Sequence, residues 1–248
     1  MHKILIIGGT SESNKLADSL SDSFITILSL QGNTEKPRLG NYLSRIGGFG
    51  GVEGLKDYLS SELIDAVVDA SHPYSKQISN NVLAATKDLN IKLYQLHRPA
   101  WKKTPLDSWF EASSFIEASF ITNSLPRNSR IFLTIGKKNL EIFEKSHKWM
   151  MVRTIDKYQK FISKGKKYIV GRGPFRIASE LINMRNNKIT HLVTRNSGSA
   201  ETYAKLYACR VLNIAIIMIG RENDDAARKS SSIETIKTNL LVHFGLNK

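Results

Sequence analysis

Residues 3–12 read Lys3-Ile4-Leu5-Ile6-Ile7-Gly8-Gly9-Thr10-Ser11-Glu12: an apolar run, two glycines and the start of a polar segment. The apolar run has the length and composition of a strand buried on both faces, as in a parallel sheet. The amphipathic pattern of Glu12–Leu20 predicts a helix directly after the glycines. A strand, a glycine turn and a helix in this order are typical of α/β folds that bind a phosphate at the helix N-terminus. A tight turn without a ligand is the alternative.

The same alternation of apolar and amphipathic segments continues along the 248 residues. Further strands are predicted at Phe24–Leu30, Ala66–Asp69, Lys92–Leu96, Arg130–Thr134, Trp149–Arg153, Tyr168–Val170, His191–Thr194 and Ala215–Ile219. Further helices are predicted at Leu55–Glu62, Lys76–Asn90, Lys138–Lys145, Phe175–Met184, Glu201–Leu212 and Ile233–Phe244. We therefore expect an α/β protein with two domains, each with a mainly parallel sheet flanked by helices. The polar stretch around Pro126 predicts the boundary between residues 1–126 and 127–248.

The composition limits the classes of function. The chain carries 36 Lys and Arg against 22 Asp and Glu, a net charge of +14, which indicates an anionic partner. The basic residues are spread along the chain without a recognition motif, so we expect neither nucleic acid nor a membrane as partner. The single cysteine excludes a disulfide framework and a multi-cysteine zinc site, and we expect no metal. We expect a cytoplasmic protein, monomeric by default.

Two further segments carry candidate chemistry. Gly47-Gly48-Phe49-Gly50-Gly51 has four glycines in five residues, which would expose backbone N–H groups to a phosphate, and a flexible linker is the alternative. Asp69-Ala70-Ser71-His72-Pro73-Tyr74 ends a predicted strand, where ligands bind in such folds. Ser71 and Pro73 suit the start of a helix. His72 is left to contact a cofactor or to transfer a proton.

Together these motifs resemble the precorrin-6A reductase family, most specifically through the blocks Arg45–Leu55 and Asp69–Tyr74. Further matches follow over nearly the whole chain, at Ile6–Glu12, Ser29–Thr34, Arg98–Trp101, Phe132–Gly136, Gly173–Phe175 and Arg195–Gly198, with Lys205 in the next helix. The resemblance implies two Rossmann-like domains with the active site in the cleft between them, and NADPH on the first domain. It implies a polycarboxylate, tetrapyrrole-derived substrate on the second domain. The implied reaction reduces one macrocycle double bond of precorrin-6A, or of cobalt-precorrin-6A, in cobalamin biosynthesis.

The motifs assign the site residues. The expected cofactor-binding residues are Gly8, Gly9, Thr10, Glu12, Ser29, Gly32, Asn33, Thr34, Arg45, Gly47, Gly48, Phe49, Gly50, Gly51, His72 and Pro73. A substrate with many carboxylates requires cations distributed around it, and the planar guanidinium binds a carboxylate with two hydrogen bonds. The expected substrate-binding residues are Arg98, Trp101, Thr134, Gly136, Arg153, Arg195, Ser197, Gly198 and Lys205.

Two points stay open in this assignment. Hydride addition also consumes a proton, for which His72 and Tyr74 are the expected catalytic residues and solvent is the alternative. Asn33 stands where the family usually has an arginine suited to the ribose 2′-phosphate, so Lys36 or Arg38 would have to supply that charge for NADPH to be preferred over NADH.

Two other classes of function compete with this interpretation. The first is another Rossmann-type NAD(P)-dependent reductase; a short-chain dehydrogenase requires Tyr-x-x-x-Lys, and neither Tyr203 with Lys205 nor Tyr207 with Arg210 has that spacing. The second is a basic nucleic-acid-binding α/β protein, which the net charge alone suggests. Thermal stabilisation by NADPH but not by oligonucleotides would favour the reductase.

Overall fold

The chain forms two parallel sheets, each with its own helices and core, as the sequence predicts. The computed structural model describes residues 1–32, 40–157, 165–221 and 232–246. Its contacts divide the chain into one unit of Met1–Pro99 with Asp225–Lys248, and a second unit of Ala100–Asp224. Within the described ranges, no helix is both long enough and apolar enough to cross a membrane.

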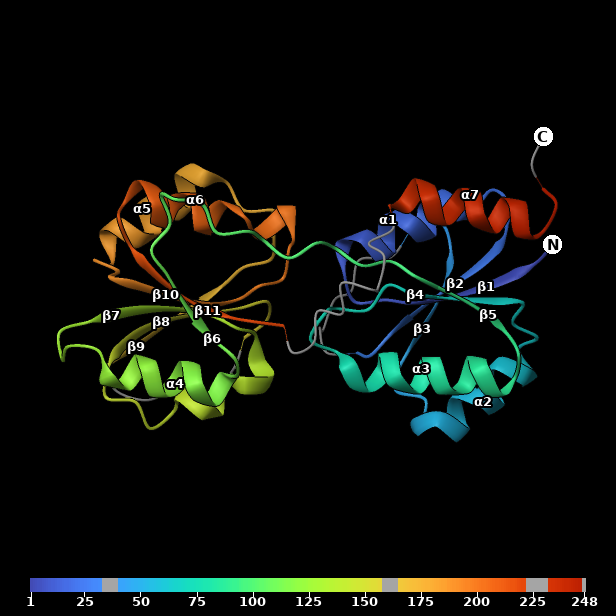
Figure 1. Cartoon of the computed structure of the whole chain (residues 1–248), viewed down its shortest axis with the longest axis horizontal. Coiled ribbons are helices and arrows are strands. Elements are labelled where there is room, and N and C mark those ends of the chain that lie inside the picture. Colours follow the sequence, from blue (N-terminus) through green and yellow to red (C-terminus); the bar gives the residue numbers. More distant parts are fainter. Residues whose placement is uncertain (33–39, 158–164, 222–231, 247–248) are drawn as a thin grey trace. The chain divides into compact units, whose positions relative to one another are not determined.

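The first unit contains a five-stranded parallel sheet in the order β3-β2-β1-β4-β5. Its strands are β1 (Lys3–Ile7), β2 (Ile25–Leu30), β3 (Leu43–Ile46), β4 (Ala66–Asp69) and β5 (Lys92–Gln95). The helices α1 (Ser11–Leu20) and α7 (Ile233–His243) cover one face, and α2 (Gly51–Ser61) and α3 (Lys76–Asp88) cover the other (Figure 1). This order matches five consecutive strands of the doubly wound nucleotide-binding order 3-2-1-4-5-6.

The central strand β1 shows why its sequence is apolar at nearly every position. Ile4 and Ile6 pack in the cluster formed with α1 and α7. Leu5 and Ile7 point to the opposite face and pack against α2 and α3. Because successive side chains of a strand alternate between faces, a strand covered on both faces has no polar position.

The second unit contains a six-stranded parallel sheet in the order β6-β11-β10-β7-β8-β9. Its strands are β6 (Trp109–Ala112), β7 (Arg130–Thr134), β8 (Trp149–Thr154), β9 (Lys166–Val170), β10 (His191–Arg195) and β11 (Ala215–Ile219). The helices α5 (Ile177–Asn186) and α6 (Ala204–Val211) cover one face, and α4 (Phe115–Ser124) and the 3₁₀ helix η1 (Lys137–Phe143) lie on the other (Figure 1). A short 3₁₀ turn, η2 (Ala200–Thr202), precedes α6.

The division between the units differs from the expected boundary at residues 126 and 127. Strand β6 pairs with β11, and α4 packs on β11 and η1, so the second unit begins well before Pro126. At the other end, α7 packs on α1 and its Ile236 and Leu240 complete the core of the first unit. The chain therefore leaves the first unit and later returns to it, so one polar linker cannot mark the boundary between the units.

Other local expectations also change. Strands β3 and β6 and helix α4 were not predicted, and the segment predicted as a helix at 138–145 is largely the 3₁₀ helix η1. Helix α3 begins at Lys76 after Ser75, so Ser71 does not cap it and Pro73 does not lie in its first turn. Helix α7 is capped by Ser232, whose hydroxyl accepts from the Thr235 N–H.

Candidate functional site

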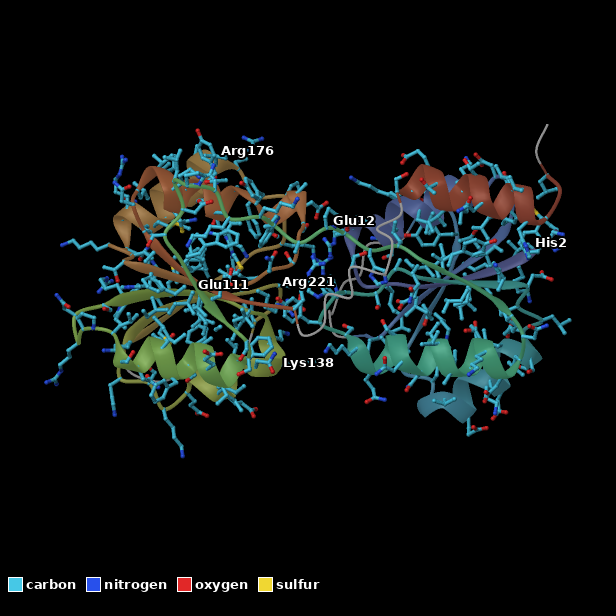
Figure 2. The ribbon with its side chains drawn as sticks, in the orientation of Figure 1. His2, Glu12, Glu111, Lys138, Arg176 and Arg221 are labelled. Atoms are coloured by element: carbon cyan, nitrogen blue, oxygen red, sulfur yellow. The ribbon has the colours of Figure 1, made fainter. Side chains whose placement is uncertain are left out.

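The turn after β1 is held by the protein's own side chains. Thr10 caps α1, since its hydroxyl accepts from Ser13 N–H at 3.1 Å while Ser13 Oγ accepts from Thr10 N–H at 3.2 Å. The Thr10 hydroxyl also lies 3.1 Å from the Ala70 carbonyl, which ties this turn to the one after β4. Glu12, labelled on α1 in Figure 2, pairs with Arg98 at 3.2 Å. The cap therefore occupies the Ser13 amide at the N-terminus of α1.

The two glycines of this turn have different roles. Gly8 packs closely, because a Cβ there would lie 2.7 Å from Leu28 Cδ1. Gly9 has φ of +119° and nothing within 4 Å of an added Cβ, so its backbone faces open space. Of these two glycines, Gly9 is the one that leaves room for a ligand to approach the main chain.

The glycine-rich segment forms a loop that leads directly into α2. Gly47, Gly50 and Gly51 have φ of +128°, +83° and +97°, which L side chains rarely adopt. At each of the four glycines from Gly47 to Gly51, an added Cβ would meet nothing within 4 Å. Gly50 is the N-cap of α2 and provides no side-chain hydrogen bond to its first amides. The loop is an open backbone surface at a helix N-terminus, which suits a phosphate.

Arg45 holds this loop in shape. Its Nη1 donates to Ser29 Oγ at 2.8 Å and to the Gly47 carbonyl at 3.1 Å, and its Nη2 donates to the Gly48 carbonyl at 3.1 Å. The guanidinium also lies over the rings of Phe49 and Tyr58, at 3.9 and 4.9 Å from their centroids. The expected cofactor residues Ser29, Arg45 and Phe49 are thus brought together, with Arg45 as the support of the loop.

The segment after β4 contains a carboxylate that sequence reasoning did not select. Asp69 is 1% exposed, and its Oδ1 accepts from the Ser71 N–H at 3.0 Å. Its Oδ2 is buried and has no hydrogen-bond partner among the described residues. A buried acceptor without a donor is costly, so this oxygen fits an N–H or O–H group of a bound ligand. Asp69 is the last residue of a buried strand and lies within a matched motif, and these two features of the sequence could have identified it as a site residue.

The two expected catalytic residues lie in the turn that follows Asp69. His72 Nδ1 accepts from the Tyr74 N–H at 3.3 Å, and the two rings lie 5.7 Å apart. Ser71 Oγ lies 3.1 Å from Ser79 Oγ and ties this turn to α3. The structure thus places His72, Pro73 and Tyr74 in the same unit as the glycine loop.

Part of the expected cofactor site cannot be placed. Asn33 and Thr34, with Lys36 and Arg38, lie outside the described residues. Gly32, just before them, has φ of +81°, and an added Cβ there would lie 3.0 Å from Ile46 Cγ2.

In the second unit, Lys205 is the centre of the expected substrate residues. Its side chain is 5% exposed, its Nζ donates to Thr134 Oγ1 at 3.1 Å, and Nζ lies 5.5 Å from the Trp101 ring centroid. Burial, followed by the positive charges of Arg153 and Arg195, lowers the pKa of Lys205 to about 7, although Glu180 opposes this shift. The amine therefore exchanges its proton near neutral pH.

Arg153, an expected substrate residue, is bound by partners within the second unit. Its guanidinium forms an ion pair with Glu180, and the two side chains are only 7% and 1% exposed. It also lies over Phe175 and Phe132, at 3.8 and 4.8 Å from the ring centroids. Because this ion pair is desolvated, we expect Arg153 to shape the site and not to exchange Glu180 for a substrate carboxylate.

Arg195 and the turn after it lie at the carboxyl end of β10. An added Cβ on Gly136 would lie 3.4 Å from Arg195 Nη2, so the guanidinium passes close to the backbone after β7. Gly198 has φ of +67°, and Ser197 Oγ lies 3.5 Å from the Thr202 hydroxyl. Ser197 does not cap a helix, since α6 begins only at Ala204 with Tyr203 as its N-cap.

The remaining two expected substrate residues, Arg98 and Trp101, belong to different units. Arg98 belongs to the first unit, where it pairs with Glu12. Trp101 belongs to the second, where Asn196 binds both its N–H, at 2.7 Å, and its carbonyl, at 3.0 Å. Arg221, labelled in Figure 2, donates to the Asn196 carbonyl at 2.8 Å. Asn196 was not an expected site residue, although it lies within the matched block after β10.

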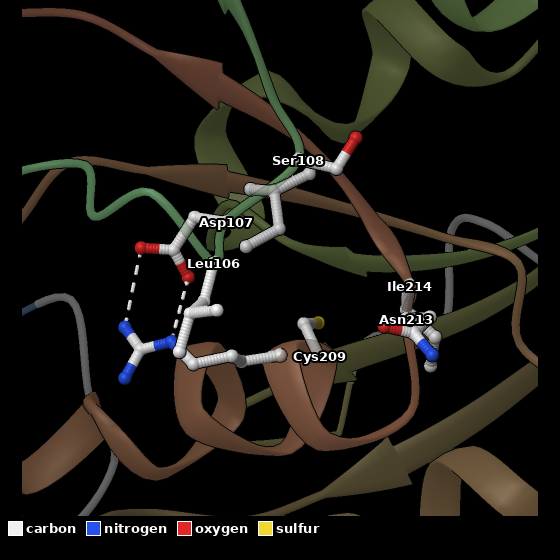
Figure 3. A pocket seen from close by; sticks show the side chains of 8 residues that line it. Leu106, Asp107, Ser108, Cys209, Asn213 and Ile214 are labelled. Atoms are coloured by element: carbon white, nitrogen blue, oxygen red, sulfur yellow. Dashed lines mark hydrogen bonds and ion pairs between the residues drawn. The ribbon is translucent and has the colours of Figure 1, made fainter.

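Two cavities of the second unit lie at opposite ends of its strands. One of about 360 Å³ is lined by the segment around Trp101 and by residues that follow β10 and β11, among them Asn196 and Arg221. A smaller one of about 80 Å³ lies where β6 and β11 begin (Figure 3). There Arg210 binds both carboxylate oxygens of Asp107, at 3.0 and 3.2 Å. Ligands of parallel α/β sheets bind at the carboxyl ends, so the smaller cavity is structural.

Comparisons with known proteins agree with this arrangement. The family model described as precorrin-6x reductase CbiJ/CobK matches residues 3–240. A precorrin-6A reductase of Rhodococcus erythropolis is 39% identical over 224 residues, which cover 89% of this chain and 90% of the relative. A cobalt-precorrin-6A reductase of Priestia megaterium is 26% identical over 255 residues, which cover 94% and 96%. A solved structure of CobK precorrin-6A reductase has a TM-score of 0.90 at 33% identity, covering 99% of this chain and 98% of that one. The chain belongs to the precorrin-6x reductase family CbiJ/CobK.

Proposed function

We propose that this protein reduces one macrocycle double bond of precorrin-6A with NADPH, giving the dihydro product, in the cytoplasm and as a monomer. The observation that carries the proposal is the family match over residues 3–240, which includes both candidate sites. The two sites have the chemistry that the two ligands require: an open backbone loop for a phosphate, and buried and half-buried cations for carboxylates.

As a reductase, the family implies a nicotinamide cofactor, and the first unit fits one. The loop Gly47–Gly51 offers backbone amides to a phosphate, and Asp69 Oδ2 lacks a donor of the kind that a ribose hydroxyl or a carboxamide provides. His72 and Tyr74 would lie beside the nicotinamide, and Gly9 and Thr10 beside the rest of the dinucleotide. When bound, the cofactor supplies a hydride. The choice of NADPH over NADH rests on Lys36 and Arg38, which follow the position where the family usually has an arginine.

The substrate would be held by the second unit. Arg195 and Lys205 provide cations, Thr134 and Ser197 provide hydroxyl groups, and Trp101 provides an aromatic surface at the carboxyl end of this sheet. We propose the metal-free macrocycle as substrate, because this chain shares 39% identity with a precorrin-6A reductase and 26% with a cobalt-precorrin-6A reductase.

The test is NADPH oxidation measured with precorrin-6A and with cobalt-precorrin-6A side by side, each repeated with NADH. We expect oxidation of NADPH, fastest with the metal-free macrocycle. Equal or faster turnover of the cobalt form would refute the choice of substrate, and faster oxidation of NADH would refute the choice of cofactor. No oxidation in any arm, together with salt-sensitive thermal stabilisation by duplex DNA, would show that the nucleic-acid-binding alternative is right.

A further inference from the structure

Lys205 is buried without an acidic partner. Its side chain is 5% exposed, yet among the described residues no carboxylate lies within ion-pair distance of its Nζ. Its nearest acid on α5, Glu180, is bound by Arg153. A lysine used only for anchoring an anion would gain from exposure or from a fixed carboxylate, because a buried ammonium without a partner is costly. This burial therefore calls for another explanation.

The charged and titratable groups around Lys205 shift its pKa in opposite directions. Arg153 approaches from β8 and Arg195 from β10, and both disfavour the ammonium form. Glu180 from α5 and Cys209, one turn further along α6, favour it, but less than burial and the arginines oppose it. With a pKa of about 7, the amine is half protonated at neutral pH, the condition under which a group transfers protons most effectively.

Thr134 connects this amine to the accessible surface of the site. It is the last residue of β7, is only partly buried, and its Oγ1 accepts from Lys205 Nζ at 3.1 Å. The same hydroxyl lies 3.3 Å from the Val193 carbonyl, to which it donates. Rotation of this hydroxyl from Val193 to a bound ligand would leave its bond to Lys205 intact, so one oxygen can accept a proton and pass one on.

We propose that Lys205 is the source of the proton that completes the reduction, and that the Thr134 hydroxyl delivers it to the macrocycle. This inference rests on the proposed function. Hydride addition forms a C–H bond at one atom of the double bond, and the π electron pair moves to the other atom. That atom takes the hydroxyl proton of Thr134, whose oxygen takes a proton from the Lys205 ammonium. The nicotinamide cofactor is oxidised, the macrocycle is reduced, and the neutral amine regains a proton from water.

The test compares the pH dependence of reduction in the wild type and five variants. In the wild type we expect kcat/KM and the single-turnover rate to fall tenfold per pH unit above about 7, because only the ammonium form donates. Lys205→Met removes the acid, so we expect a rate lower by about 100-fold or more and no such fall with pH. Lys205→Arg keeps the cation but cannot donate a proton, so KM stays near the wild-type value and the rate falls as in Lys205→Met.

Thr134 offers a matched pair of variants. Thr134→Val keeps the shape but removes the hydroxyl, and we expect the loss seen in Lys205→Met. Thr134→Ser keeps the hydroxyl and stays within about threefold of the wild-type rate. A measurement without turnover is the titration of the Lys205 side chain by ¹³C NMR in the free protein, assigned with Lys205→Arg, where we expect a midpoint near 7.

Three results would overturn the inference. Lys205→Arg with the wild-type rate and pH profile would show that only the charge matters. Thr134→Val with the wild-type rate would exclude the relay. If the rate of Lys205→Met still falls with rising pH but the rate of His72→Asn does not, the proton would be assigned to His72. A wild type that titrates near 7 by NMR but does not oxidise NADPH with either macrocycle would instead refute the proposed function.

Discussion

We propose that the carboxyl ends of the two sheets bind their ligands by different chemistry. In the first unit the binding surface is backbone, a glycine loop whose side-chain support, Arg45, lies behind it. In the second unit the surface is made of side chains: Lys205 binds Thr134, and Arg195 and the ion pair of Arg153 and Glu180 act on the charge of Lys205. The difference follows from the ligands, because one phosphate suits converging amides and scattered carboxylates need separate cations.

The largest effect is expected from breaking the support of the second surface. Glu180→Ala leaves the buried Arg153 without its partner, and we expect a loss of about 3–5 kcal/mol in the free energy of unfolding. The matched control is Glu62→Ala, whose half-exposed ion pair with Lys3 should contribute less than about 1 kcal/mol. Denaturant unfolding measures both. Equal losses in the two variants would contradict the structural role of the buried pair.

The next effect concerns the first surface. Gly48 has ordinary backbone geometry and nothing within 4 Å of an added Cβ, so Gly48→Val should fold normally but project into the space of the cofactor. We expect the Kd for NADPH to rise by about 100-fold, a loss of about 2.7 kcal/mol in binding free energy. The control is Gly220→Ala in the second unit, where the added Cβ makes only ordinary contact, 3.6 Å from the Ala112 carbonyl. Unchanged NADPH affinity in Gly48→Val would remove the loop from the cofactor site.

A smaller effect separates shape from charge at the glycine loop. Arg45→Lys keeps the positive charge but cannot reproduce the fork that binds Ser29 and two carbonyls of the loop. We expect the Kd for NADPH to rise by about tenfold, measured by fluorescence titration. An affinity equal to that of the wild type would indicate that Arg45 acts only through its charge.

A separate effect, on folding and not on binding, is the pH dependence of stability that Lys205 imposes. Between its lowered folded-state pKa of about 7 and its ordinary value of 10.5, the amine is neutral when folded and charged when unfolded. The unfolded state then binds more protons, so the stability of the wild type should rise with pH in this range relative to Lys205→Met. Denaturant unfolding of both proteins at pH 7 and 9 checks the sign. A wild-type stability that falls with rising pH relative to that of Lys205→Met would contradict the assignment.

The sequence predicted the buried part of the fold better than its edges. Strands such as β1 are apolar because both faces are covered, and that signal is local. Strand β3 is a short edge strand that exposes Leu43 and Ile46. Helix α4 exposes Ile116 and Phe120 at 73% and 74% while burying Ala118 and Thr122. Neither element therefore has the expected periodicity. The return of α7 to the first sheet depends on long-range packing against α1, which no local pattern encodes.

The sequence motifs locate the candidate segments, whereas the contacts of their individual side chains depend on the fold. The glycine loop and the segment after β4 both lie at the carboxyl end of the first sheet, as expected. However, Arg153 and Arg98 are each paired with a glutamate, and Asp69 and Asn196 were not selected. Whether a charged residue faces a ligand or a partner is set by contacts between residues distant in sequence, so the motif alone could not separate these cases.

The most direct test of two surfaces with two chemistries is a pair of dissociation constants, for NADPH and for precorrin-6A, measured in Gly48→Val and in Arg195→Ala. We expect Gly48→Val to raise the Kd for NADPH by about 100-fold and to leave the Kd for precorrin-6A within about twofold of the wild-type value. Arg195→Ala should raise the Kd for precorrin-6A by about tenfold and leave the Kd for NADPH unchanged. If both variants weaken the same ligand, or if Gly48→Val weakens only precorrin-6A, the assignment of the cofactor to the first unit and the macrocycle to the second is wrong.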